Sequence, residues 1–534
     1  MRVGFRARSY LNSSLVVVSS ALTLLVVCVG FSRAEELVVQ TTLGNVTGSV
    51  EEVTFNDDID TEVTEQFVQF LGIPYAEPPL GNRRFTKPEP KSAWTESHNG
   101  TFYRPSCHHG NQQVTSSFDV VDDDISEDCL TLDIYSPFSI NSSTPYTVLV
   151  FIHSSPSSSR AFVADVLSSY GQVVVVVINY RQGYLGFFSV GNDSVSGNYG
   201  LWDQHLAISW VNEHIANFNG DPDMVTLVGH STGASDAILQ TLYAGNMGKI
   251  KGVVAMSGTP IQTYSTNSFM MTSVGDTLAT MVGCGNRSSQ DTFTCLRTKS
   301  LQDLDAAVSA SKSNMNFKPV IDGDFIKANP HEIITSDGNM YAAERDGFLG
   351  VDLLLGLNNK EGGAHVGLMW AQLLGTNVSS FDIDSSQFRQ IVVPTAMRLI
   401  FGGNISESVI ETVNFQYSDI TDPTNAEKPK QNVVDLSTDI DIAAPLVKTA
   451  NAHSMKNISA TFVYQFSEEV GALNPLTPSW LDGANRADDV YSLFGFSQRV
   501  LHTLANGTNF TPTVNQRKAS RYMMTTIANF AKTG

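Results

Sequence analysis

Positive charge is scarce in this sequence. Its 33 Lys and Arg residues stand against 53 Asp and Glu residues, which gives a formal net charge of −20. A surface of this sign repels nucleic acid and anionic lipid, so nucleic-acid binding is excluded as a function. Internal repeats and long low-complexity linkers are also absent. Because 42% of the residues are hydrophobic and 16% are charged, the chain can form a substantial core.

Long apolar runs are absent from the mature part of the chain. After residue 34 no stretch has the ~18 consecutive apolar residues that a membrane helix needs. The apolar segment at residues 12–34 follows Arg2, Arg6 and Arg8 and ends at Ser32 and Ala34. This layout predicts a signal peptide over residues 1–34, cut after Ala34. Because the apolar segment is long for a signal peptide, an uncleaved signal anchor is the alternative.

Cysteine is rare too. Of five cysteines, Cys28 belongs to the leader, and the remaining four are an even number, which favours disulfides formed in an oxidising compartment. Together with a leader, ten Asn-x-Ser/Thr sequons predict a glycosylated protein that is secreted or held on the extracellular face of the cell. The sequons begin at Asn45, Asn99, Asn141, Asn192, Asn286, Asn377, Asn404, Asn457, Asn506 and Asn509.

The mature chain alternates short apolar runs with segments of helical character. Continuous apolar runs predict strands buried on both faces, and their alternation with helices predicts a mostly parallel α/β sheet. The expected strands are Thr147–His153, Gln172–Asn179, Val225–Gly229, Gly252–Met256, Leu353–Leu357 and Thr461–Phe466, and the expected helices include Leu201–Phe218 and Ala234–Tyr243. The alternation continues throughout, so one domain is expected over residues 35–534.

One motif combines a strand, a tight turn and a helix. Residues 225–234 read Val-Thr-Leu-Val-Gly-His-Ser-Thr-Gly-Ala, with Ser231 at the centre of a Gly-x-Ser-x-Gly turn. Such a turn lifts a serine hydroxyl above the sheet edge and points a helix N-terminus at it. Small residues are required because the turn is tight. The motif predicts a nucleophile elbow.

Further motifs, in order along the chain, give a family resemblance. They are residues 72–79 (GIPYAEPP), Arg84-Phe85, residues 126–132 (SEDCLTL), residues 179–181 (NYR), residues 197–204 (GNYGLWDQ), residues 218–222 (FNGDP), residues 463–466 (VYQF) and residues 529–534 (NFAKTG). With the elbow, they resemble the type-B carboxylesterase/cholinesterase family, which implies the α/β-hydrolase fold. Family members normally continue a few tens of residues beyond the last motif, so Gly534 is either a truncation point or an early natural end.

The resemblance assigns roles to individual residues. It pairs Cys107 with Cys129 and Cys284 with Cys295, and it implies no cofactor and no metal. Ser231 stands at the position of the nucleophile, and Glu361, in Gly356-Leu-Asn-Asn-Lys-Glu-Gly362, stands at that of the triad acid. The position of the family's base histidine is taken by Arg486, in Gly483-Ala-Asn-Arg-Ala-Asp-Asp489. Guanidinium has no lone pair with which to accept a proton. His230 is expected to be a packing residue, and His453 and His502 are the histidines nearest to position 486 in sequence.

The oxyanion hole also departs from the family pattern. Where the family has a His-Gly-Gly-Gly-like string, this chain has His153-Ser-Ser-Pro156. Pro156 has no N–H to donate, and Ser154 and Ser155 lack the freedom of glycine. Of the expected donors, Ser155 and Thr232 are left. Loss of one donor costs about 10²–10³ in rate, and loss of the base costs about 10⁶ in the subtilisin series.

These departures favour a catalytically inactive, cholinesterase-like protein. By resemblance to non-catalytic family members, it would act in adhesion or assembly through an extracellular protein partner. Two alternatives stay open: a weak or atypical ester hydrolase that uses Ser231, and a carrier that binds a small ester-like or apolar ligand. A choline site is not supported, because Phe118 is the sole aromatic ring of the Trp, Tyr or Phe type between Cys107 and Cys129. Membrane contact is expected only through an uncleaved leader or through an anchor beyond residue 534.

Overall fold

The protein is described here from a computed structural model. The described residues are 36–57, 60–110, 124–138, 144–190, 197–262, 268–311, 315, 317–336, 338–401, 403, 405–417, 425, 427–474, 477–497, 499–500 and 510–534. The expected leader, residues 1–34, lies outside them, as do Phe118 and His502. Within these ranges, no helix combines the length and the apolar character needed to cross a membrane.

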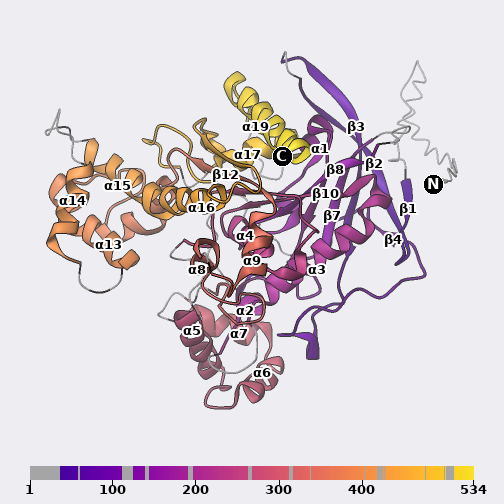
Figure 1. The fold of residues 1–534 in the computed structure, drawn as a ribbon, viewed down its shortest axis with the longest axis horizontal. Coiled ribbons are helices and arrows are strands. Elements are labelled where there is room, and N and C mark those ends of the chain that lie inside the picture. Colours follow the sequence, from indigo (N-terminus) through magenta and orange to yellow (C-terminus); the bar gives the residue numbers. More distant parts are fainter. Residues whose placement is uncertain are drawn as a thin grey trace, which may run out of the picture.

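Among the described residues, a central mixed sheet of 11 strands organises the fold (Figure 1). Its order is β1-β2-β3-β7-β9-β8-β10-β11-β12-β13, with β4 added beside β2. The strands are β1 Glu36–Gln40, β2 Asn45–Asn56, β3 Glu62–Pro74, β4 His98–Asn99, β7 Thr131–Pro137, β8 Tyr146–Ile152, β9 Val174–Ile178, β10 Gly220–His230, β11 Gly252–Met256, β12 Asp352–Asn358 and β13 Thr461–Phe466. A separate pair joins β5 Ser106–Cys107 to β6 Ile125–Ser126.

The two halves of the sheet differ in direction. From β9 through β8, β10, β11 and β12 to β13 the neighbours are parallel, whereas β1, β2, β3, β7 and β9 pair antiparallel. The six strands expected from apolar runs are those of the parallel half. The predicted fold class, an α/β-hydrolase fold with a mostly parallel central sheet flanked by helices, is confirmed.

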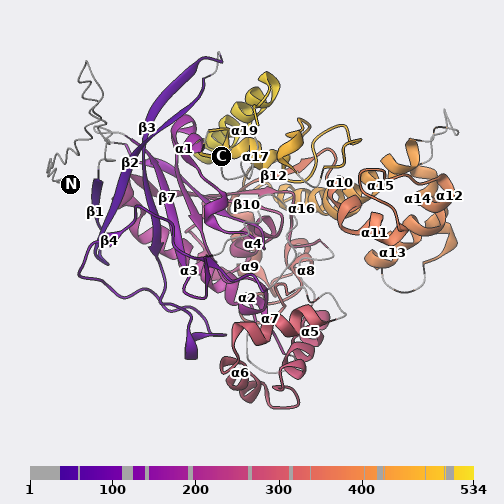
Figure 2. The same cartoon turned by 180° about the vertical axis from the view of Figure 1, so that it is seen from behind.

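Helices cover both faces of the sheet (Figures 1 and 2). Strand β8 contributes Val148, Val150 and Ile152 to one apolar cluster, together with α3, α4, α9 and α16, and Leu149 and Phe151 to the other, together with α1, α17 and α19. The covering helices are α1 Asp165–Gly171, α3 Tyr199–His214, α4 Thr232–Leu242, α9 Ala342–Leu349, α16 Ala444–Ser454, α17 Asp488–Phe494 and α19 Val514–Thr533. Burial on both faces explains why these strands are apolar along their whole length.

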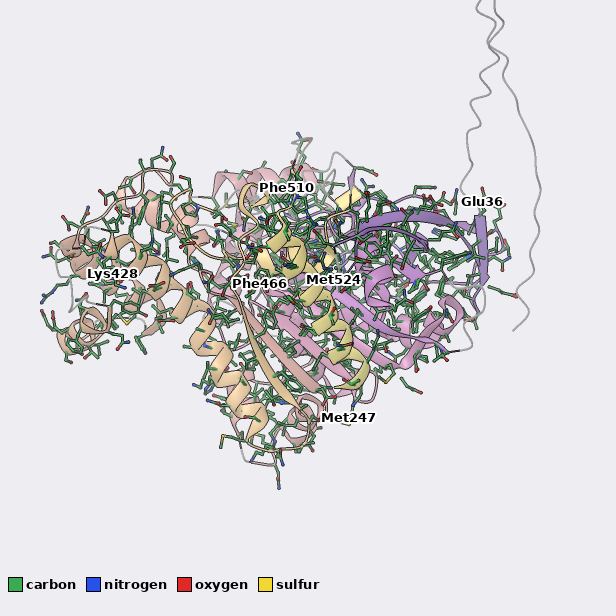
Figure 3. All side chains as sticks on the ribbon, turned by 90° about the horizontal axis from the view of Figure 1, so that it is seen from above. Glu36, Met247, Lys428, Phe466, Phe510 and Met524 are labelled. Carbon is green, nitrogen blue, oxygen red and sulfur yellow. A yellow bond between two sulfur atoms is a disulfide. The ribbon has the colours of Figure 1, made fainter. Side chains whose placement is uncertain are left out.

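The remaining helices form two groups that extend away from the sheet (Figures 1 and 2). One group holds α5 Ser268–Met281, α6 Ser289–Arg297 and α7 Leu301–Ala310, near α2 Gly183–Phe187 and α8 Pro330–Thr335. The other holds α10 Gly363–His365, α11 Ala371–Leu374, α12 Ser385–Gln387, α13 Val393–Phe401, α14 Glu407–Tyr417 and α15 Lys428–Thr438, and it encloses an apolar cluster of its own. Lys428 in this second group and Glu36 on β1 lie at opposite ends of the molecule (Figure 3).

One expectation about burial is wrong. Strand β13 was expected to be buried on both faces, like the other apolar runs, yet Phe462 and Val463 are 46% and 52% exposed. The reason is its position, because β13 is the last strand of the sheet and pairs only with β12 among the described strands. Figure 3 shows this strand from above, with Phe466 at one of its ends.

Candidate functional site

The candidate site lies where the parallel strands end. Ser231 follows β10, Ser257 follows β11, and Glu361 lies three residues after the end of β12. Parallel strands bring their carboxyl ends to one edge of a sheet, where open α/β sheets place their sites. The loop before α17 adds Arg486, held by a backbone bridge between Lys360 and Asn485. Segments more than 250 residues apart therefore meet at this edge, since Arg486 bonds Ser231 across a separation of 255.

Ser231 occupies the elbow predicted from the sequence. Its backbone has φ 57° and ψ −117°, a strained conformation for a residue with a side chain. A Cβ placed on Gly229 would lie 2.2 Å from the Gly233 carbonyl oxygen, and one on Gly233 would lie 2.0 Å from that of Ile152. Backbone packing thus requires glycine at both positions of the motif, and the turn places Ser231 directly before α4.

Glu361 is fully buried and held by several donors. Its Oε1 accepts hydrogen bonds from the Ser257 hydroxyl, from the Asn358 N–H at 2.8 Å and from Asn358 Nδ2 at 3.1 Å. Its Oε2 has no hydrogen-bond partner and faces Arg486. The carboxylate is therefore fixed by one oxygen and directs the other at the residue in the histidine position.

Arg486 joins Ser231 to Glu361. Its Nη2 donates to Ser231 Oγ at 2.7 Å and to the Ser257 carbonyl at 3.4 Å, and its Nη1 lies 3.5 Å from Glu361 Oε2. The ion pair expected between Arg486 and Glu361 is present. In this arrangement the serine oxygen accepts a hydrogen bond from a cation. A catalytic histidine would instead accept the serine proton.

His230, next to the serine, is a poor substitute base. It is buried, and burial together with the charge of Arg486 lowers its pKa to about 3. Its Nε2 has no hydrogen-bond partner. A group with so low a pKa takes a proton inefficiently near neutral pH, where a general base needs a pKa close to the working pH. His230 therefore remains neutral and fills space beside the elbow.

The oxyanion loop is altered as the sequence indicates. Pro156 is buried and supplies no N–H. The Ser155 N–H donates to Thr232 Oγ1 at 3.1 Å, so this expected donor already has an acceptor. The Thr232 N–H is at the first position of α4, where the helix offers it no acceptor. Of the expected donors, the Thr232 N–H is therefore the one that lies at a helix N-terminus, in a position set by the elbow.

Of the two histidines considered from the sequence, the described one, His453, makes its hydrogen bonds away from Ser231 and Glu361. His453 contacts Thr461 Oγ1 at 2.7 Å and the Val351 carbonyl at 3.0 Å, so it joins α16 to the sheet. His502 lies outside the described residues. The histidine that sequence reasoning missed is His365, at the end of α10, whose charge interacts with those of Arg486 and Glu361. Its signal in the sequence was its spacing, four residues after the acid.

His365 belongs to a small group of titratable side chains that interacts electrostatically with Arg486 and Glu361. Its Nε2 lies 3.1 Å from Asp441 Oδ2, and burial lowers the pKa of His365. Lys318 also interacts with Asp441, and burial lowers the pKa of Lys318 to about 8. A π-helical turn, Val366–Trp370, follows His365 directly, and a second one, Asp439–Ala443, carries Asp441. Such turns are frequent at functional sites.

The structure describes some of the residues that bear on export. Disulfides join Cys107 to Cys129 and Cys284 to Cys295, with Cα separations of 5.0 and 5.7 Å, the pairing that the family resemblance implied. The five described sequon asparagines, Asn45, Asn99, Asn286, Asn377 and Asn457, are all exposed. The other five, Asn141, Asn192, Asn404, Asn506 and Asn509, lie outside the described residues. Across the described ranges, no group of three or more His, Cys, Asp or Glu side chains could hold a metal ion.

Comparisons with known proteins show the family of this chain. The sequence model of the Carboxylesterase family matches residues 35–534. The chain is 33% identical to mouse neuroligin-2 over 93% of its length and 32% identical to mouse neuroligin-3 over 89%, and in each case it covers 60% of the relative. It is also 30% identical to rat carboxylesterase 1C, in an alignment that covers 88% of this chain and 82% of the relative. The chain therefore belongs to the carboxylesterase family.

Proposed function

We propose that this chain is a catalytically inactive, cholinesterase-like protein that works by binding an extracellular partner. The single observation that carries inactivity is the hydrogen bond from Arg486 Nη2 to Ser231 Oγ. Ester hydrolysis on a serine begins when a base removes the hydroxyl proton. Here the residue in the place of the base donates a hydrogen bond to the same oxygen and has no lone pair with which to accept its proton.

A second defect acts at the next step. Attack on an ester carbonyl develops negative charge on the carbonyl oxygen, which oriented N–H groups must stabilise. Pro156 has no N–H, and the Ser155 N–H is bonded to Thr232 Oγ1. Because the two defects act on different steps, correction of one leaves the other in place.

The binding role is supported by family membership and by surface features. The chain resembles neuroligins over most of its own length but spans only 60% of theirs, so a shared role is proposed for the matched part. Two disulfides and exposed sequons suit export through the secretory pathway. A leader over residues 1–34 would direct that export and leave the domain over residues 35–534 outside the cell.

A labelling experiment tests inactivity. The purified wild-type protein is treated with a fluorophosphonate probe and assayed for p-nitrophenyl butyrate hydrolysis, beside its Ser231→Ala variant. We expect no stoichiometric labelling at Ser231 and no turnover above that of Ser231→Ala. Rapid labelling, with turnover that Ser231→Ala abolishes, would instead establish the alternative of an atypical hydrolase with an unrecognised base.

Two repair variants separate the defects. Arg486→His alone should stay inactive, because the oxyanion loop still lacks its donors. A combined variant with Arg486→His and glycine at positions 154–156 should gain measurable turnover if both defects matter. Turnover by the single variant would show that the loop is competent and that Arg486 is the sole block.

A cell-binding experiment tests the partner. The purified chain, presented on beads, is incubated with intact cells before and after mild protease treatment of the cell surface. An adhesion protein should bind saturably and lose binding after the treatment. Absence of saturable binding across a panel of cell types would favour a carrier role over adhesion.

A further inference from the structure

The site presents hydrogen-bond donors to solvent. Ser231 is half-buried and Thr232 is exposed, so a small molecule can reach this edge. A hydroxyl has one proton to donate. Because Ser231 Oγ already accepts from Arg486, its proton points elsewhere, and no described residue accepts it. A hydroxyl that accepts from a cation is a strengthened donor.

Arg486 has donors left over as well. A guanidinium carries five N–H groups. Its Nη2 serves Ser231 and the Ser257 carbonyl, whereas Nη1 is 3.5 Å from Glu361 Oε2, longer than an ordinary hydrogen bond. The Arg486 side chain is 22% exposed, while Glu361 is fully buried. The ion pair thus balances the charge of Arg486 through one long contact, so the N–H groups of Nε and Nη1 can bind a further acceptor.

Each cation of this group interacts with a carboxylate. Arg486 is paired with Glu361, and Lys318 interacts with Asp441, which also contacts His365. A third carboxylate, Asp489, lies close to Glu361, since Asn358 Nδ2 donates to both. A dianion such as phosphate would bring two negative charges towards these carboxylates, whereas a monoanion would bring one and would still gain directional hydrogen bonds.

We infer that this site binds a small carboxylic acid as its carboxylate, with one oxygen on the Ser231 hydroxyl and the other on Arg486. The inference rests on the proposed inactivity, since it requires Ser231 to keep its proton. An enzyme of this family would bind the ester and release the acid. This chain would retain the acid and bind the ester poorly, because an ester carries no charge for Arg486 to pair with.

Equilibrium binding of matched probes tests the preference. Benzoate, methyl benzoate and benzamide share one ring and differ in the group offered to Arg486, and their dissociation constants for the wild-type protein are compared by ligand-observed NMR. Benzoate should bind at least about 10-fold more tightly than either neutral probe, the effect of one charge-assisted bond. Equal or tighter binding of methyl benzoate overturns the inference.

Variants assign the preference to Arg486. Arg486→Gln should bring benzoate and benzamide to similar affinities, whereas Arg83→Gln, which removes an exposed arginine paired with Glu89, should leave the preference unchanged. A preference that survives in Arg486→Gln refutes the assignment. If Arg486→Gln does not fold, crystals of the wild type soaked with 4-iodobenzoate decide, because the iodine locates the acid. A carboxylate bound away from Arg486 contradicts the proposal.

Failure of this inference differs from failure of the proposed function. Turnover of p-nitrophenyl butyrate overturns inactivity whatever the acid affinity is. An absent preference for benzoate, in a protein that shows no turnover, overturns the acid site alone.

Discussion

Replacement of Arg486 by methionine should destabilise the fold, and the structure sets the size of the effect. Methionine keeps most of the stem and removes the charge. Breaking a buried ion pair by removing one partner costs about 3–5 kcal/mol. Here Glu361 keeps three donors on Oε1, and the Arg486 side chain is 22% exposed, so water can reach the vacated place. We therefore expect Arg486→Met to lower the free energy of unfolding by about 2 kcal/mol at pH 7.

A double-mutant cycle identifies the origin of that loss. Urea unfolding, followed by tryptophan fluorescence with the disulfides intact, is measured for wild type, Arg486→Met, Glu361→Gln and the double variant. If the cost comes from stranding Glu361, Arg486→Met should cost about 1 kcal/mol less in the Glu361→Gln background. An equal cost in both backgrounds would refute the reasoning. Arg83→Met is the control, because its pair with Glu89 is exposed and such pairs contribute only about 0–1 kcal/mol.

Three other predictions concern parts of the fold away from Arg486. Hydrogen bonds from Arg517, with a smaller contribution from Arg521, lower the pKa of Asp60 from 3.8 to about 2. The stabilisation from Asp60 is therefore complete above about pH 4 and is lost as the pH falls towards 2. The difference in urea midpoint between wild type and Asp60→Asn should narrow over that range. A constant difference would contradict this prediction. Removing the Cys284–Cys295 disulfide by serine substitution should lower the free energy of unfolding by about 2.8 kcal/mol, and removing Cys107–Cys129 by about 3.4 kcal/mol, because they close loops of 11 and 22 residues. The reverse order would count against the chain-entropy model. Gly233→Ala should reduce the soluble yield sharply, because its Cβ would meet the Ile152 carbonyl oxygen. Gly375→Ala is the control: it has open space at its Cβ and φ +66°, so it should lower the free energy of unfolding only by the ~1–2 kcal/mol of a left-handed residue. Similar yields of the two variants would show that the elbow can relax.

The sequence allowed the parallel half of the sheet to be predicted but not the antiparallel half. Strands β8, β9, β11 and β12 are buried on both faces and read as continuous apolar runs, and β10 does so from Val225 onwards. Strand β2 carries Glu51 and Glu52 between apolar residues and is partly exposed, so its strand character has a weak signal. Period-two alternation interrupted by charge is harder to recognise than an unbroken run. Position in the sheet, which the sequence does not state, decides the difference.

The site shows the same division. Ser231, Glu361 and Arg486 could be predicted because motifs fix their register on both sides. His365 and Asp441 come from separate segments, 76 positions apart, each at a π-helical turn, and no motif joins them. Lys318 reaches the same group from a third segment. Contacts of this kind depend on packing between elements, so a linear pattern does not reveal them.

The elbow has a consequence for how serine hydrolases are recognised. Gly229 and Gly233 are demanded by carbonyl oxygens of the protein's own backbone, and Ser231 holds its unusual dihedral angles with an arginine bonded to it. The turn is therefore a joint between a strand and a helix, and its geometry does not depend on any reaction. A search that takes Gly-x-Ser-x-Gly as a sign of activity would count this chain as an enzyme, against the inactivity that we propose. Such a search should first inspect the position of the proton acceptor, which in this chain is Arg486, 255 residues after the serine.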